Sequence, residues 1–131
     1  MPTFYEFFAG AGMVRAGLGE EWSCVFANDI DVKKCASYAT NWGDEHLKVG
    51  DVGDVEVKDL PGTADLAWAS FPCQDLSLAG NGLGLKGERS GTFWPFWRLT
   101  ERLGKEGRVP AVVVLENVWG AFASHGGKVS R

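Results

Sequence analysis

Residues 3–31 read TFYEFFAGAGMVRAGLGEEWSCVFANDID, and this stretch is the main indication of the fold class. An aromatic, strand-like run at 3–8 is followed by a glycine-rich turn. A helix is expected at 13–18 and a second strand at 23–27. A strand, a helix and another strand in this order predict two parallel strands joined by a right-handed crossover.

The rest of the chain continues this alternation, so we expect an α/β fold with a doubly wound, mostly parallel sheet. Asp31 is the expected N-cap of the next helix. The last strand is apolar along its whole length, which predicts helices on both of its faces. Only an irregular tail, 119–131, follows it, so we expect an open edge that a missing segment or another chain covers. The further elements expected are a helix from 32 to about 41, strands at 48–49, 66–70 and 111–115, and a helix at 93–103.

Length and composition fit one globular domain. The chain has 131 residues, of which 45% are hydrophobic and 23% are charged, which excludes a disordered protein. The net charge of −4 lacks the overall basic balance of many nucleic-acid-binding domains, so a DNA-contacting surface would be local or lie elsewhere. No apolar stretch approaches the ~20 residues of a membrane span.

The cysteines are Cys24, Cys35 and Cys73, and none of them forms a CxxC pair. A zinc site is therefore not expected, and the odd number favours a reducing compartment. Cys24 and Cys35 suit the usual role of a free cysteine as an inert core residue. Cys73 differs, because it follows Pro72 at a strand end and precedes a long glycine-rich loop, where a thiolate can act as a nucleophile. No histidine partner is identifiable, which disfavours a Cys-His hydrolase.

Glycines and an acid at strand ends form a candidate cofactor site. Gly10 and Gly12 allow a ligand to approach the backbone, although the same turn also suits a ligand-free strand–helix junction. Asp29, roughly 20 residues further on, can accept both hydroxyls of a ribose. Helix capping is the alternative role for Asp29, but Asp31 suits that role better.

Four further side chains have an open interpretation. Asp51 either accepts from an adenine amino group or is an ordinary turn aspartate. Ile30 either contacts a flat ring or belongs to the core. Glu116 follows four apolar residues, so we expect a buried carboxyl that holds a proton for a ring nitrogen; a strand terminus reaching solvent is the alternative. Asn117 could fix the local backbone or orient the loop that carries Cys73.

Together these residues resemble the cytosine-C5 DNA methyltransferase family. The resemblance covers nearly the whole chain, and its most specific parts are Pro-Cys-Gln and Glu-Asn-Val. The matching stretches, in the family's order, are FFAGAGMVRAGL, FANDID, GDV, FPCQDLSLAG, RSGTFW and LENVWGAFASHGG.

The resemblance implies a Rossmann-like, S-adenosylmethionine-dependent methyltransferase fold that is incomplete at its C-terminal side. It implies that Cys73 attacks carbon 6 of a flipped-out cytosine in DNA while Glu116, beside Asn117, holds or protonates N3. It also implies a loop at 74–91 that closes over the base and touches DNA through Gln74, Ser77 and Arg89. The implied cofactor contacts are Phe8, Gly10, Gly12, Asp29, Ile30, Asp51 and Phe93.

Two positions depart from the family's pattern. Met13 stands where many members have another glycine, and Asp29 replaces the commoner glutamate. The family's later arginine-containing motif, its target-recognition region and its closing cofactor segment are absent. We therefore expect residues 1–131 to form part of a catalytic domain, with little methyl transfer by this chain alone.

The sequence also gives expectations about the partner, the rival functions and the location of the protein. The partner of the chain would be DNA together with a C-terminal half or a second polypeptide that carries the target-recognition region. A non-catalytic subunit and an RNA cytosine methyltransferase are the rival functions. The expected location is the cytoplasm for a bacterial or phage protein and the nucleus for a eukaryotic one, without membrane contact.

Overall fold

The structure is a computed structural model that describes residues 1–72 and 92–118. The expected loop at 74–91 and the tail at 119–131 lie outside the described residues, as does Cys73.

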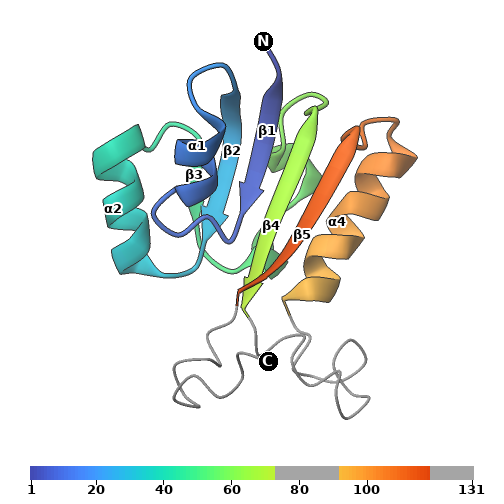
Figure 1. Cartoon of the computed structure of the whole chain (residues 1–131). Helices are drawn as coiled ribbons and strands as arrows, with labels where there is room; N and C mark the ends of the chain where they lie inside the picture. The colour runs from blue at the N-terminus through green and yellow to red at the C-terminus, as the bar shows by residue number, and fades with distance from the viewer. Residues whose placement is uncertain (73–91, 119–131) are drawn as a thin grey trace, which may run out of the picture.

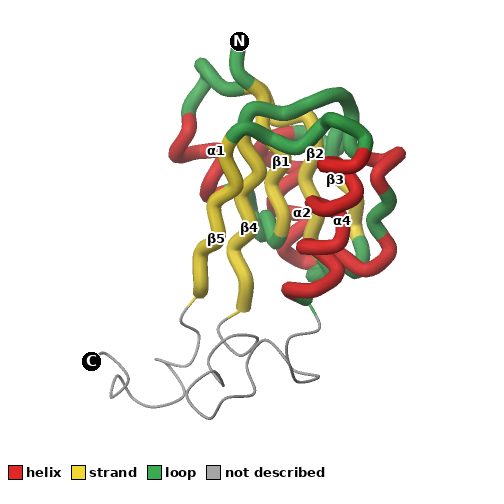
Figure 2. The backbone as a smooth tube through the Cα atoms, turned by 90° about the vertical axis from the view of Figure 1, so that its right-hand side faces the viewer, coloured by secondary structure: helices red, strands yellow, loops and turns green. Residues whose placement is uncertain are grey.

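A five-stranded parallel sheet with strand order β3-β2-β1-β4-β5 forms the centre of the fold (Figure 1). Figure 2 shows α1 and α4 on opposite sides of the strands. The strands are β1 (Thr3–Phe7), β2 (Ser23–Asp29), β3 (Leu47–Val49), β4 (Leu66–Pro72) and β5 (Val112–Val118), and the helices are α1 (Met13–Leu18), α2 (Val32–Trp42), α4 (Phe93–Lys105) and the 3-10 turns η1 (Val52–Asp54) and η2 (Val57–Asp59).

The alternation of side chains along β1 divides the core between two faces of the sheet. Tyr5 and Phe7 belong to a cluster that includes Phe96 of α4, whereas Phe4 belongs to a cluster that includes Tyr38 of α2. Glu6 lies on the same face as Phe4, because successive side chains of a strand point to opposite sides. This arrangement is a three-layer α/β/α fold.

The predicted fold class and the order of elements are confirmed. Helix α1 has its expected bounds, and Asp31 caps α2 by accepting from the backbone N–H groups of Lys33 and Lys34. Strand β2 runs to Asp29 and β5 runs to Val118, both beyond the expected ends, because their polar residues continue the ladders with β3 and β4.

The expectation that helices cover both faces of the last strand is wrong for the described residues. Val112 is 53% exposed and Leu115 is 48% exposed. Helix α1 lies over the centre of the sheet, and no described helix continues that layer over β5 (Figures 1 and 2). An apolar sequence therefore did not ensure burial, because burial needs a covering element.

Candidate cofactor and active site

The strand order changes direction between β1 and β4, and the predicted glycine turn follows β1 at that point. Strands β2 and β3 lie on one side of β1, and β4 and β5 lie on the other. Figure 1 shows β1, β2 and β4 ending at the same edge of the sheet. In open α/β sheets, ligands bind outside the carboxyl ends of the strands at such a switch point.

The turn after β1 has an unusual backbone. Gly10 has φ of 58° and Gly12 has φ of 92°, which glycine adopts easily. Phe8 also has φ of 58°, a value that is uncommon for a residue with a side chain. Strained residues of this kind cluster at functional sites. The glycines in the sequence predicted a tight turn here, but nothing in the sequence indicated the left-handed conformation of Phe8.

Hydrogen bonds tie this turn to the end of β2. The backbone N–H of Gly10 donates to Oδ2 of Asp29 at 2.8 Å, and that of Asp31 donates to Oδ1 of Asp29 at 2.8 Å. The N–H of Ala9 donates to the carbonyl of Asn28 at 3.0 Å. Asp29 therefore holds the glycine turn and the start of α2 in one arrangement, at the position expected for a ribose-binding acid.

Asn28 is a positioning residue that the sequence analysis missed. Its buried side-chain amide donates to the carbonyls of Lys48 at 2.8 Å and Gly50 at 3.0 Å. These bonds fix the end of β3 and the segment that leads to Asp51. An asparagine between an apolar run and Asp29 was the available signal, but it is also typical of an ordinary turn.

The two glycines of the turn face different surroundings. A Cβ added to Gly10 would meet only Cδ of Lys34, at 3.9 Å, so one side of Gly10 is open. A Cβ added to Gly12 would overlap the indole of Trp42. The Trp42 indole N–H donates to the carbonyl of Ala11 at 3.1 Å. The close approach at Gly12 is therefore to α2, and Gly10 is the glycine with space for a ligand.

Ile30 and Asp51 flank this edge. Ile30 is 63% exposed, so the alternative that it is a core residue is wrong. Asp51 is exposed, and its Oδ1 accepts from the N–H of Gly53 at 2.7 Å as the cap of η1. Asp51 thus has the local role of a turn aspartate, and a contact with a cofactor stays a prediction.

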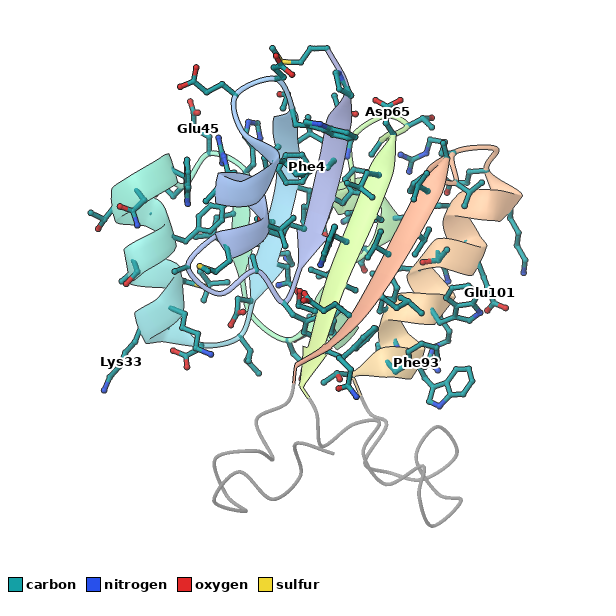
Figure 3. The ribbon with its side chains drawn as sticks, viewed as in Figure 1. Phe4, Lys33, Glu45, Asp65, Phe93 and Glu101 are labelled. Atoms are coloured by element: carbon teal, nitrogen blue, oxygen red, sulfur yellow. The ribbon has the colours of Figure 1, made fainter. Side chains whose placement is uncertain are left out.

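An aromatic wall links β1, β4 and α4. The ring centroids of Phe8 and Phe71 are 5.0 Å apart, and those of Phe71 and Phe93 are 5.4 Å apart. Figure 3 shows Phe93 at the end of α4 nearest the carboxyl ends of the strands. Phe71, which the sequence analysis did not select, therefore joins two predicted cofactor contacts.

The environment of Glu116 differs from the one expected from the sequence. It is exposed, and its Oε1 accepts from the indole N–H of Trp68 at 3.2 Å and from the Ser70 hydroxyl at 3.0 Å. The expectation of a buried carboxyl is wrong, because the α1-side face of β5 has no described cover. Oδ1 of Asn117 is buried and accepts no hydrogen bond within the described residues.

A groove runs along the side of α1 that faces Trp68 and Glu116. Its volume is about 370 Å³. Met13, Val14, Gly17, Leu18, Trp68 and Glu116 line it. The Glu116 carboxylate therefore lies in a partly apolar recess, held by two donors on β4.

The buried carboxyl of the sheet is Glu6, which the sequence analysis did not select. Glu6 is 1% exposed. Burial raises the pKa of its carboxyl to about 7, and the N–H groups of Val14 and Arg15 and the Arg15 charge offset only part of that effect. An acid within an aromatic strand was the only signal, and it also suits an exposed edge.

Several predicted site residues lie outside the described part of the chain. They are Cys73, Gln74, Ser77 and Arg89. Cys73 follows the last residue of β4 in the sequence. Cys24 and Cys35 are buried free thiols, as expected.

The fold and the strand order define a doubly wound, parallel α/β domain. The sequence profile of the C-5 cytosine-specific DNA methylase family matches residues 2–130, so the chain belongs to that family. Methyltransferases of this family and fold generally use S-adenosylmethionine.

Individual relatives support this family assignment. The Type II methyltransferase M.BsuFI of Bacillus subtilis is 30% identical over 130 residues, which is 98% of this chain and 30% of that protein. M.Eco47II of Escherichia coli is 32% identical over 127 residues, which is 96% of this chain and 29% of that protein. The chain thus spans about 30% of the length of these curated relatives.

Solved structures share the fold. The crystal structure of the S. pombe Dnmt2 methyltransferase superposes with a TM-score of 0.69 at 23% identity, covering 94% of this chain and 38% of that one.

In the described part of this chain, no helix has the length and apolar character that a membrane crossing requires.

Proposed function

We propose that residues 1–131 are the cofactor-binding and nucleophile-bearing part of a cytosine-C5 methyltransferase that acts on DNA. The observation that carries the proposal is the turn at the switch point. Gly10 is open on one side, its N–H is tied to Asp29, and the apolar side chain of Ile30 is exposed beside that acid. An open turn, a ribose-accepting acid and an apolar surface for a ring suit a nucleoside-containing cofactor.

The described residues fit S-adenosylmethionine. Asp29 would accept the ribose hydroxyls, and Asp51 would accept from the adenine amino group. Ile30 would contact the adenine ring, while Phe8 and Phe93 would form the wall around Phe71. When bound, the cofactor supplies an electrophilic methyl group for carbon 5 of cytosine.

The protein's own groups would do the remaining chemistry. The Cys73 thiolate would form a bond to carbon 6, which makes carbon 5 nucleophilic. Glu116 would hold a proton at N3 while charge develops on the ring, with Trp68 and Ser70 fixing its carboxylate. After carbon 5 loses its proton to a base, Cys73 would leave carbon 6 and N3 would return its proton. Gln74, Ser77 and Arg89 would contact DNA.

Cofactor binding is the first test. Calorimetry should detect S-adenosylmethionine binding by the 131-residue chain, and Asp29→Ala should weaken it roughly 100-fold, since two hydrogen bonds to the ribose are lost. Asp44→Ala is the matched control, because Asp44 is an exposed acid beyond α2. Equal affinity in both variants would exclude Asp29 as a ligand.

The nucleophile and the substrate need a second test. Because the relatives are about three times longer, we expect little methyl transfer until a polypeptide with the family's target-recognition region is supplied. Covalent capture of 5-fluorocytosine in DNA, lost in Cys73→Ser, would support the proposal. Capture only in RNA would favour the rival substrate, and no capture in any assembly would favour a non-catalytic subunit.

A further inference from the structure

Glu6 is a buried carboxyl that the proposed reaction does not use. It lies on β1 between Ala27 of β2 and Trp68 of β4. It is 1% exposed, and neither carboxylate oxygen has a hydrogen-bond partner within 3.5 Å among the described residues. Burial of an unpaired carboxylate is strongly unfavourable, and unsatisfied buried groups in native proteins usually have a specific reason.

Polar groups in the first turn of α1 act on the Glu6 carboxyl. They are the backbone N–H groups of Val14 and Arg15, and they favour the ionised form without completing a hydrogen bond. The Arg15 guanidinium is held by α2 instead. It donates to the Tyr38 hydroxyl at 3.1 Å and lies 5.1 Å from the centre of the Trp42 ring.

Other ionisable groups surround this position on each neighbouring element. Asp29 at the end of β2 opposes ionisation of Glu6, and the buried Cys24 thiol of β2 feels the Glu6 charge. Behind Arg15, the Tyr38 hydroxyl of α2 contacts the Cys24 sulfur at 3.4 Å. On the other side, Trp68 of β4 is in register with Glu6, and its indole N–H donates to Glu116 of β5. Among the described residues, Arg15 is therefore the cation that acts on Glu6, and Asp29 is the acid that connects Glu6 to the proposed cofactor site.

The position of Glu6 connects it to the cofactor turn. Glu6 lies two residues before Phe8, the strained residue that starts the turn, and its side chain lies on the face of the sheet that α1 covers. Asp29 holds Gly10 at one end, and the first turn of α1 follows Gly12 at the other. A change in charge at Glu6 thus acts on both anchors of this segment.

We propose that Glu6 is a positioning residue for the cofactor turn: in its ionised form it accepts from the N–H groups of Val14 and Arg15 and draws α1 toward β1, and a cationic cofactor promotes release of the Glu6 proton to solvent. This inference rests on the proposed function. The cofactor class is an adenosyl sulfonium, whose positive charge offsets that of Asp29 and so removes a cause that opposes Glu6 ionisation.

The Glu6 carboxyl gains and loses its proton near neutral pH. Burial raises the pKa of Glu6 to about 7, so both forms are populated there. Because proton release and cofactor binding are linked, affinity should rise with pH. S-adenosylhomocysteine has the same frame without the sulfonium charge, and its affinity should depend less on pH.

The first experiment compares affinities by calorimetry. For a pKa lowered by one unit on binding, the affinity of the wild-type chain for S-adenosylmethionine should be roughly fivefold higher at about pH 8 than at about pH 6. Glu6→Gln should remove this dependence, and Glu20→Gln, at an exposed residue beyond α1, should keep it. An unchanged dependence in Glu6→Gln would overturn the inference and leave the proposed function intact.

The second experiment needs no cofactor and no variant. The backbone amide resonances of Gly12, Val14 and Arg15 in the wild-type chain should shift together with a midpoint near the pKa of Glu6. Their invariance between about pH 5 and about pH 8 would overturn the positioning role. If the chain binds no cofactor at any pH, the proposed function fails, and this titration alone decides whether Glu6 positions α1.

Discussion

The α1-side face of the sheet has two halves that differ in cover. Strands β1 to β3 lie beneath α1 and α2, β4 is partly covered, and no described helix lies over this face of β5 (Figures 1 and 2). Glu6 in the first half is 1% exposed, and Glu116 in the second half is exposed. Both residues are glutamates in parallel strands, so the covering layer and not the strand sequence sets their environment.

Trp68 lies at the boundary between these halves. Its backbone is in register with Glu6, but its indole N–H donates to Glu116. The exposed carboxylate therefore has two donors, and the buried one has none within the described residues. Hydrogen-bond partners and burial are therefore separate properties of a carboxyl group, and burial without partners favours its protonated form.

The largest effect is expected where α1 meets α2. Gly12→Ala should lower the free energy of unfolding by about 4 kcal/mol, because the new Cβ overlaps Trp42 and the residue keeps a positive φ. Chemical denaturation measures this loss. Gly19→Ala is the matched control, with φ of 82° and open space, and should lose about 1 kcal/mol. Equal losses would show that Trp42 does not confine the turn.

The next effect is a pH dependence of stability. The pKa of Glu6 is about 7 in the native state and near 4.5 for an unperturbed carboxyl. Between these values the native state keeps a proton that the unfolded state has lost, so stability should fall by about 3 kcal/mol from about pH 5 to about pH 8. Denaturation curves across this range measure the fall.

The two glutamates give the control for that measurement. Glu6→Gln should abolish the fall, whereas Glu116→Gln should retain it. The Asp31 carboxyl, whose pKa the Lys34 N–H lowers, affects stability only at more acid pH, where protonation removes the cap of α2. A fall that persists in Glu6→Gln would contradict the assignment of this proton.

A smaller effect is expected at the boundary. Trp68→Phe removes the indole N–H that donates to Glu116 and should lower the free energy of unfolding by about 1 kcal/mol. Ser70→Ala removes the other donor to the same oxygen. A double-mutant cycle should therefore show coupling of about 0.5 kcal/mol. Strict additivity would indicate that the two donors act independently.

The smallest effect is expected in the uncovered half. Val112→Ala should change stability by less than about 0.5 kcal/mol, because Val112 is largely exposed. Leu66, its register partner on β4, is buried, and Leu66→Ala should cost about 3 kcal/mol. Similar costs at both positions would mean that a further part of the protein covers β5 in solution.

Much of the fold could be predicted from local signals. Four predicted features depend on residues that are near each other in the chain, and each is confirmed. They are the glycine turn, the helix at 13–18, the Asp31 cap and the order of the strands along the chain. Strand ends were predicted less well. Polar residues such as Asn28 indicate a turn locally, but the neighbouring strand supplies bonding partners that continue the ladder.

Some features of the candidate site also follow from local sequence, and others depend on the tertiary fold. The order of residues places each candidate side chain after a particular strand, and the motifs alone indicate the methylase family. The strain at Phe8, the packing of Gly12 against Trp42, the exposure of Glu116 and the burial of Glu6 depend on the tertiary fold. The physical reason is that burial and close approach depend on groups far apart in the chain, whereas turns and caps depend on neighbours.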